Sequence, residues 1–237
     1  MTSIRLAVVG MGKMGRAVSA LAAERGFQVV ATLDAADMAG SLTREALGGA
    51  DVAIEFTVPE AAPGNIRELV NAGCPVVVGT TGWHDALPEI SAYVREHHGA
   101  LLWAPNFSIG VNLFQRLVTE AARLFGAAPG FDAHLIETHH SAKKDAPSGT
   151  AISLERAASA ALGRPIPITS IRTGSVPGTH ELLFDSPFET VRLEHVARDR
   201  RVFAEGALMA ARWLVGREGV FEMKDVLDST TTTSRSA

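Results

Sequence analysis

Short apolar runs alternate with amphipathic segments through the first hundred residues of the chain. The apolar runs have the length of buried strands and lie at residues 4–10, 27–34, 51–57, 75–81 and 100–105. Helical patterns separate several of them, at residues 15–26, 65–73 and 87–99. This alternation predicts a parallel sheet with helices on both faces, which is a Rossmann-like doubly wound α/β fold. Ligands of such sheets bind beyond the carboxyl ends of the strands.

The pattern changes after residue 105. Residues 108–126 read as one long helix that begins near Asn106 or Ser108. Strand-like segments follow at residues 131–138, 167–174, 179–185 and 189–197. Gly, Pro and Asp-Ser turns separate the last three, which favours antiparallel pairing among them. Residues 201–216 then return to helical spacing.

These patterns predict two domains. The first covers residues 1–105 and is completed by residues 205–230, while residues 106–204 form a second, α+β domain with a mixed or antiparallel sheet. Residues 231–237 are too polar to pack, and we expect a disordered tail there.

Composition excludes several classes of protein. The net charge of −4 argues against a general nucleic-acid binder, which is usually basic. No signal-peptide pattern and no apolar stretch of about 18 residues is present, so we expect a cytoplasmic protein without a membrane span. The single cysteine, Cys74, cannot form an internal disulfide, and its place at the head of an apolar run indicates a buried structural thiol.

The first apolar run ends in the sequence GMGKMG, residues 10–15. Gly10, Gly12 and Gly15 have the G-x-G-x-x-G spacing, which allows a tight turn, close approach of a pyrophosphate, and close helix–strand packing. The helix that follows offers unpaired N–H groups to phosphates. Asp34 closes the second strand, where an acidic side chain accepts hydrogen bonds from an adenosine ribose. Together these residues predict a dinucleotide site.

The segment after Asp34 bears on the choice of dinucleotide. Asp34 is followed by Ala-Ala-Asp-Met, with no arginine to receive a 2′-phosphate, which favours NADH over NADPH. Lys13, inside the glycine loop, could still offset a phosphate, so both cofactors remain open.

Two further strand ends carry hydroxyl groups. Thr57 lies three residues before Glu60, a capping-box spacing that could start the next helix. The sequence GTTGW begins at Gly79 and adds Thr80 and Thr81 at the same edge of the predicted sheet. Each feature alone is equally typical of a plain cap or turn. Their common place at the carboxyl edge favours contact with the cofactor.

The stretch ETHHSAKKDAPSGTA, residues 137–151, gathers acid–base and anion-binding groups. His139 and His140 titrate near neutral pH. Ser148, Gly149 and Thr150 precede a strong helix pattern, so they form an anion site at its start. This combination suits a small substrate that bears carboxylates and must receive a proton.

The lysines and histidines of this stretch also have simpler interpretations. Lys143 and Lys144 add positive charge, although paired lysines usually form a solvated surface, and this applies above all to Lys144. The two histidines could bind a metal, but no cysteine or acidic cluster at ligand spacing accompanies them, so we predict no metal site.

These motifs resemble those of the dihydrodipicolinate reductases of bacterial lysine and diaminopimelate synthesis. The resemblance covers nearly the whole chain and rests on the glycine loop, EFT, GTTG, APNFSIGVN, ETHHSAKKDAPSGTA, RTGSVPGTHE and MKDVL. Glu55 stands where the family usually has Asp. Three further features depart from the family: the chain is shorter between the second and third strands, Ser141 and Ala142 replace basic residues of some members, and no arginine follows Asp34.

The resemblance implies an activity and a set of site residues. The activity is NAD(P)H-dependent reduction of 4-hydroxy-tetrahydrodipicolinate or dihydrodipicolinate, a small dicarboxylate, to tetrahydrodipicolinate. His139 then matches the general acid, Lys143 assists it and binds substrate with His140, and Ser148, Gly149 and Thr150 hold a substrate carboxylate. The positions matched to cofactor binding are Gly10, Met11, Gly12, Lys13, Met14, Gly15, Asp34, Phe56, Thr57, Gly79, Thr80, Thr81, Ala104, Asn106 and Phe107. The family also implies a homotetramer formed through the sheet of the second domain.

Two other functions fit parts of the sequence. A nucleotide-sensing Rossmann protein accounts for the first hundred residues but gives no reason for the groups between Glu137 and Ala151 to occur together. An enzyme that acts on another amino-acid-derived imine, such as an aspartate dehydrogenase, would also need an anion site, but the motifs of the second domain do not favour it.

Overall fold

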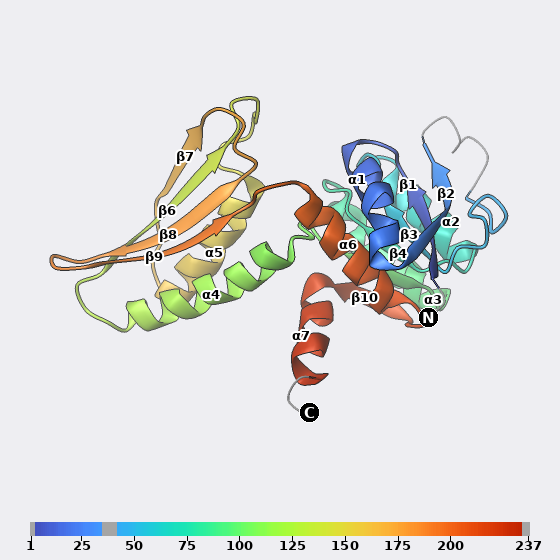
Figure 1. Ribbon diagram of the computed structural model, residues 1–237. Helices are drawn as coiled ribbons and strands as arrows, with labels where there is room; N and C mark the ends of the chain where they lie inside the picture. The colour runs from blue at the N-terminus through green and yellow to red at the C-terminus, as the bar shows by residue number, and fades with distance from the viewer. Residues whose placement is uncertain (1–2, 35–41, 234–237) are drawn as a thin grey trace. The chain divides into compact units, whose positions relative to one another are not determined.

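The computed structural model describes residues 3–34 and 42–233. The chain divides into two compact units, one made of Met1–Ser108 with Phe203–Ala237 and the other of Ile109–Val202 (Figure 1). No described helix is both long enough and apolar enough to cross a membrane.

Unit 1 is built on a six-stranded sheet in the order β10-β5-β4-β3-β1-β2. All neighbouring strands are parallel, which confirms the predicted Rossmann-like fold. The strands are β1 Ile4–Val9, β2 Phe27–Leu33, β3 Val52–Glu55, β4 Val76–Val78, β5 Ala100–Trp103 and β10 Gly219–Glu222. We did not predict β10, because its four half-buried residues are too few to show a strand pattern.

Helices cover both faces of this sheet (Figure 1). They are α1 Lys13–Ala22, α2 Ala62–Asn71, α3 Leu87–Glu96, α6 Arg201–Leu214 and α7 Met223–Thr233, with short 3₁₀ turns η1 Ala23–Arg25 and η3 His84–Ala86. Ala7 and Val9 of β1 point into a core shared with α2 and α3. Val8, which lies between these two residues, points to the other face of the sheet and lies against Gly15 of α1. The strands are therefore buried on both sides, as their continuous apolar sequences require.

The start of α2 differs from the prediction. Thr57 does not cap this helix, because its hydroxyl is bound to the Glu55 carboxylate. The helix begins five residues later, at Ala62, and Pro63 lies in its first turn. Proline is well suited to that place because the first N–H groups of a helix have no intrahelical partner.

The end of the chain also differs in part. The disordered tail expected over residues 231–237 is wrong for residues 231–233, since α7 continues to Thr233. The indole of Trp213 donates to the Ser229 hydroxyl, and this hydroxyl donates to the Val226 carbonyl, so α7 is tied to α6 at Ser229. Residues 234–237 lie outside the described residues.

Unit 2 is a four-stranded mixed sheet in the order β7-β6-β8-β9, with two helices on one face (Figure 1). Its elements are α4 Ile109–Gly126, β6 Asp132–His139, α5 Gly149–Leu162, β7 Ile168–Arg172, β8 Thr179–Asp185 and β9 Thr190–Val196. The antiparallel pairing predicted for the last three strands holds for β8 and β9. It is wrong for β7, which pairs with β6 in parallel because α5 supplies the crossover between them.

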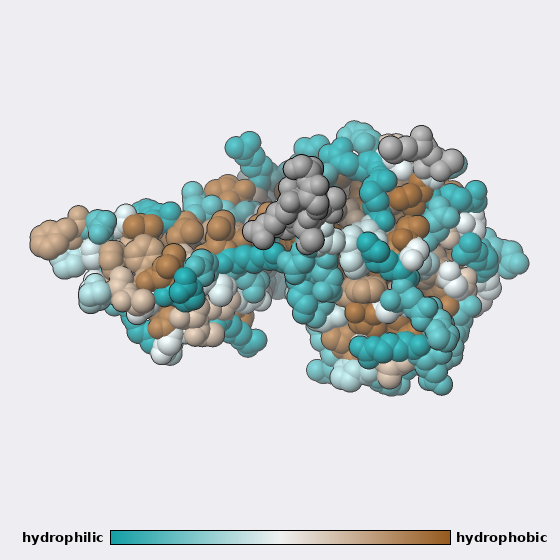
Figure 2. Space-filling view, turned by 90° about the horizontal axis from the view of Figure 1, so that it is seen from below, coloured by the Kyte–Doolittle hydropathy of each residue, from teal (hydrophilic) through white to brown (hydrophobic). Residues whose placement is uncertain are grey.

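The two faces of this sheet differ in burial. One face packs on α4 and α5 through an apolar cluster that includes Phe114, Leu135, Leu154, Leu182 and Phe184. On the opposite face, Ile136 and Leu183 are half-buried, while Ile171 and Val196 are exposed. Seen from below, unit 2 also presents apolar side chains over α4, where Leu113, Leu117 and Leu124 are exposed (Figure 2).

Candidate functional site

Two glycines of the first loop are required by packing inside unit 1. Gly10 has a φ of +91°, and a Cβ there would lie 2.3 Å from the Phe56 carbonyl oxygen. A Cβ on Gly15 would lie 1.9 Å from the carbonyl oxygen of Gly10. The N–H of Gly10 donates to the Leu33 carbonyl at 2.7 Å, so the loop stays close to the end of β2. No larger residue fits either position without a backbone shift.

Gly12 is different, because a Cβ built on it meets nothing within 4 Å. It is the N-cap of α1 and has no side chain to satisfy the first N–H groups of that helix. The first turn contains no acidic residue either, and it begins with Lys13 and Met14. Open space, unpaired N–H groups and a positive dipole end fit the phosphates of a dinucleotide.

Asp34 lies where a ribose-binding acid is expected, directly after β2. It is exposed, and the Met11 N–H of the glycine loop approaches its Oδ1 at 3.5 Å. The Ala-Ala-Asp-Met segment that favoured NADH lies outside the described residues.

Glu55 forms a second centre at the carboxyl ends of β3 and β4. Its carboxylate is fully buried and accepts hydrogen bonds from Asn65, from both the N–H and the hydroxyl of Thr57, and from Thr80. Burial raises the pKa of Glu55, and these hydrogen bonds oppose the shift only in part. The Thr57 N–H also donates to the Thr80 hydroxyl at 2.8 Å. The network thus fixes the two threonines that the sequence places near the cofactor.

Other predicted cofactor residues surround this network. Gly79 is held by packing, since a Cβ on it would lie 1.9 Å from the Phe56 ring. That ring meets Phe107 edge-on at 6.2 Å. Asn106 accepts the Ser108 N–H at 2.8 Å, Ala104 and Phe107 are buried, and Thr81 is exposed.

His139 lies at the end of β6 in unit 2 and pairs with a buried carboxylate. Its Nδ1 is hydrogen-bonded to Oε2 of Glu137, two residues earlier on the same face of the strand. Oε1 of Glu137 accepts from Arg172 at 2.7 Å and from the Ser148 N–H at 3.3 Å. Burial opposes ionisation of Glu137, but hydrogen bonds from Arg172, Ser170 and His139 outweigh it and lower its pKa to about 2. Glu137 is therefore an anion at neutral pH.

Two effects of opposite sign set the protonation of His139. Burial lowers the pKa of its ring, and the hydrogen bond and charge of Glu137 raise it again in part. Lys143 and Arg172, both positive, lower the pKa further. The side chain of His139 remains 10% exposed, which leaves it access to a ligand.

A second buried histidine, His180, lies beside this pair. Its ring meets that of His139 edge-on at 5.3 Å, and its Nε2 lies 3.3 Å from the Ser148 hydroxyl. Burial lowers the pKa of His180 to about 4, and the positive charge that His139 carries when protonated acts in the same direction. His180 is therefore neutral at pH 7.

The rest of the predicted anion site lies at the start of α5. Ser148 is its N-cap and accepts the Ala151 N–H at 3.2 Å. Gly149 is exposed with open space around its Cβ position, and Thr150 is half-buried. This helix end is therefore open to an anion.

The basic residues of the stretch have partners of their own. Lys143 pairs with Asp145 at 2.8 Å, and Arg200 approaches His140 Nε2 at 3.4 Å. Lys144 is exposed, as a solvated lysine would be.

Three residues of this site were missed in the sequence: the buried Glu137 and His180 and the half-buried Arg172. The spacing of Glu137 and His139 was a usable signal, because residues two apart on a strand share a face. Arg172 and His180 belong to motifs that we had noted, but only the strand register brings them to Glu137.

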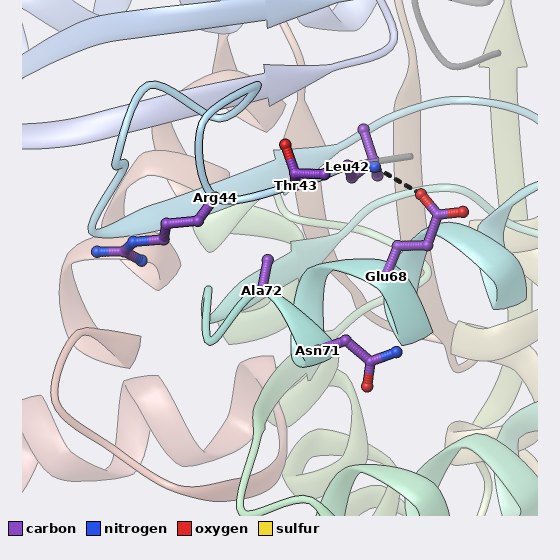
Figure 3. A pocket seen from close by; sticks show the side chains of 6 residues that line it. All are labelled: Leu42, Thr43, Arg44, Glu68, Asn71 and Ala72. Carbon is purple, nitrogen blue, oxygen red and sulfur yellow. Dashed lines mark hydrogen bonds between the residues drawn. The ribbon is translucent and has the colours of Figure 1, made fainter. Parts of the chain in front are cut away.

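No group of three metal-ligating side chains occurs among the residues the structure describes. A surface cavity of about 380 Å³ is lined by Leu42, Thr43, Arg44, Glu68, Asn71 and Ala72 (Figure 3). Glu68 accepts the Leu42 N–H, and Arg44 and Asn71 also have hydrogen-bond partners, so no reactive group faces this cavity unpaired.

The Rossmann-like sheet with its glycine loop, joined in one chain to a histidine–carboxylate site, defines a two-domain dinucleotide-dependent oxidoreductase. Comparison with family models makes the assignment more specific. The model described as "Dihydrodipicolinate reductase, N-terminus" matches residues 4–107, and the one described as "Dihydrodipicolinate reductase, C-terminus" matches residues 110–227. The chain belongs to the dihydrodipicolinate reductase family, whose members use pyridine nucleotides.

Curated relatives agree with this assignment. The chain is 38% identical to a 4-hydroxy-tetrahydrodipicolinate reductase of Thiobacillus denitrificans, over 95% of this chain and 98% of the relative. It is 34% identical to a protein of the same name from Christiangramia forsetii, over 94% and 98% of the two chains.

Solved structures show the same fold. A dipicolinate-bound dihydrodipicolinate reductase from Paenisporosarcina sp. TG-14 superposes with a TM-score of 0.78 at 24% identity, over 93% of this chain and 97% of that one. An aspartate dehydrogenase from Thermotoga maritima gives a TM-score of 0.52 at 9% identity, over 90% and 97% of the chains. The second likeness shows a shared architecture only.

We expect His180 to make the protein less stable in acid. Its pKa is about 4 when folded and about 6.5 when unfolded, so between these values the unfolded chain binds more protons. The free energy of unfolding should therefore fall as the pH drops from about 6.5 to 4, by about 3 kcal/mol from this residue. Urea denaturation across this range should show a shallower fall in His180→Gln. Equal slopes in wild type and His180→Gln would contradict the prediction.

Proposed function

We propose that the protein reduces 4-hydroxy-tetrahydrodipicolinate, or its dehydrated form dihydrodipicolinate, to tetrahydrodipicolinate with NAD(P)H, in diaminopimelate and lysine synthesis. The observation that carries the proposal is the buried His139–Glu137 pair in the same unit as the open start of α5. The names of the curated relatives support the substrate. Because the reaction consumes NAD(P)H, we infer a cytoplasmic protein.

The start of α5 suits a substrate carboxylate. Ser148 uses its hydroxyl to cap the helix, so the N–H groups of Gly149 and Thr150 and the Thr150 side chain are the groups assigned to the carboxylate. Lys143 adds a positive charge and exchanges Asp145 for the substrate. His140 lies in the same loop and is assigned a supporting contact. Loss of these groups should weaken binding more than chemistry.

Proton donation is assigned to His139. NAD(P)H in the unit 1 site would supply hydride chemistry at C4 of the conjugated cyclic imine, and negative charge would then develop on the C3 side. Nε2 of protonated His139 gives its proton to that carbon, and the ring becomes neutral while Nδ1 keeps its proton toward Glu137. Lys143, near His139, assists by its positive charge.

The cofactor is assigned to the carboxyl edge of the sheet in unit 1. The glycine loop with Lys13 and the N-terminus of α1 would hold the pyrophosphate, and Asp34 would hold the ribose. The residues assigned to the nicotinamide side are Phe56, Thr57, Gly79, Thr80, Thr81, Ala104, Asn106 and Phe107. We propose that the protein prefers NADH over NADPH.

Alanine substitutions in the glycine loop should separate folding from cofactor binding. Gly12→Ala should change the free energy of unfolding by no more than about 1 kcal/mol, because its Cβ meets nothing. It should weaken NADH and NADPH binding roughly tenfold or more, since a methyl group blocks the approach of the pyrophosphate. Gly15→Ala should instead destabilise the fold. Fluorescence titration and thermal unfolding measure the two effects, and unchanged affinity in Gly12→Ala would remove the phosphates from this loop.

Turnover is the direct test of the proposed function. Wild type should oxidise NADH or NADPH at 340 nm when supplied with freshly generated dihydrodipicolinate precursor, and His139→Gln should be about 10²-fold slower or more. A folded, dinucleotide-binding wild type without turnover would contradict the reductase assignment and favour a sensor. Oxidation of aspartate would indicate the aspartate dehydrogenase activity instead. Equal rates in wild type and His139→Gln would move the proton donor to His140 or Lys143.

We further propose that unit 2 binds substrate and also assembles the protein into a homotetramer. The support is the sheet face opposite α4 and α5, where Ile136, Ile171, Leu183 and Val196 are half-buried or exposed. No described element of unit 2 covers this face, and the resemblance to the family implies assembly through this sheet.

Introducing a negative charge on each of the two sides of unit 2 should locate the interface. Wild type should sediment near 100 kDa, four times the chain mass of 25.0 kDa. Leu183→Glu, at the centre of the sheet face, should dissociate the assembly, because a buried unpaired charge is costly. Leu117→Glu, at an exposed site on α4, should remain tetrameric. Dissociation by Leu117→Glu alone would place the interface on α4.

A further inference from the structure

One row of the unit 2 sheet is polar on the face that packs against the helices. The row contains one residue from each strand, and these cross-strand neighbours are Ser170, Glu137, His180 and His195. The next row toward the centre of the sheet is fully apolar and contains Ile168, Leu135, Leu182 and Leu193. A buried carboxylate and a buried histidine, with a half-buried histidine beside them, are costly in a sheet interior unless they are paired, so a function for this row is expected.

The contacts of Glu137 have a definite direction. Its Oε2 is hydrogen-bonded to the Nδ1 of His139, and Oε1 accepts from Arg172 and from the Ser148 N–H. The Ser170 side chain gives the carboxylate a further hydrogen bond. Arg172 also donates to the carbonyl groups of Ile171 and Asp145, which fixes its guanidinium. The carboxylate is therefore held by donors from β7 and from the start of α5 as well as by His139, and these contacts keep it turned toward the histidine.

The other nitrogen of His139 lies on the opposite side of the ring. In the described part of the chain, Nε2 of His139 makes no hydrogen bond. A Cβ built on Gly178 would lie 3.0 Å from this nitrogen, so the glycine keeps the space beside Nε2 open. A carboxylate on Nδ1 requires the proton to stay there, because an ionised carboxylate can only accept.

We infer that Glu137 is a positioning residue, held by Arg172 and the Ser148 N–H, which keeps the Nδ1 proton of His139 in place and makes Nε2 the nitrogen that exchanges the reaction proton. The inference rests on the proposed function. It adds a role for Glu137 and Arg172 that acts through His139 and not through contact with substrate.

Every charged or titratable group around His139 bears on its protonation. Glu137 on β6 favours the imidazolium, whereas Arg172 on β7 and Lys143 in the following loop disfavour it. His180 on β8 faces the ring and is neutral above about pH 4. Glu137 is thus the one anion among these described neighbours, and its neutralisation should make His139 harder to protonate.

Glu137→Gln tests the inference because the amide keeps the shape of the carboxylate. Its oxygen can still accept from Arg172, but its NH₂ group would face Nδ1 and disfavour a proton there. We expect kcat to fall about 10²-fold with a KM change of less than about threefold, because only the proton donor is affected. The basic limb of the pH–kcat profile should move to lower pH. Asp132→Asn, which removes an exposed carboxylate from the same strand, should match wild type.

A double-mutant cycle separates positioning from a structural role. If Glu137 acts through His139, then Glu137→Gln combined with His139→Gln should be no slower than His139→Gln alone. Multiplying effects in the double variant, or a wild-type pH profile in Glu137→Gln, would overturn the inference. Absence of turnover in wild type would instead contradict the proposed function.

Nitrogen NMR of the wild type gives a result that does not depend on the folding of any variant. The neutral ring of His139 should carry its proton on Nδ1, and the assignment of this resonance can be made by its loss in His139→Gln. A neutral ring with the proton on Nε2 would overturn the inference.

Discussion

The arrangement of unit 2 depends on the hydrogen bonds that the buried carboxylate of Glu137 accepts. An ionised carboxyl group inside a protein is unfavourable by several kcal/mol unless donors compensate it. Here Arg172 comes from β7, His139 from β6 and the Ser148 N–H from the start of α5, so one anion connects two strands and a helix. The same contacts that satisfy the charge also orient the histidine and the helix N-terminus. Stability and chemistry therefore have a common origin at this end of the sheet.

The second buried carboxylate of the chain, Glu55, is compensated in a different way. Its donors are hydroxyl and amide groups and not cations, so burial dominates and raises its pKa, whereas the pKa of Glu137 is lowered to about 2. The two environments suit different tasks. A charge held beside His139 favours its protonated form, while the Glu55 carboxylate fixes Thr57 and Thr80 through hydrogen bonds. Glu55 thereby performs a structural role at a position where the family usually has aspartate.

The sequence was sufficient for the features that depend on local pattern. The parallel sheet followed from continuous apolar strands, and the candidate site residues at the starts of α1 and α5 followed from glycine, serine and histidine spacing. The features it did not show depend on register or on competition between partners. Thr57 has a capping spacing, but its hydroxyl binds Glu55, and α2 begins at Ala62. Strand β7 was paired incorrectly because turn residues do not reveal the parallel crossover made by α5. Arg172 and His180 could not be assigned to Glu137, since only pairing across three strands brings them together.

Register also explains why the carboxylate is at residue 137 and not elsewhere on the same face. Two residues toward the start of β6, at Leu135, the cross-strand neighbours are Ile168 and Leu182, which offer no donor. A carboxylate there would remain uncompensated or protonated. Two residues onward, at His139, the neighbour on β7 is Arg172, and the chain leaves the sheet toward the loop that carries Lys143 and Ser148. Only the row of Glu137 lies next to both the donors and the ring that uses them. The polar row therefore lies at this edge of the core, where Glu137 is buried and still hydrogen-bonded to His139, whose ring is partly exposed.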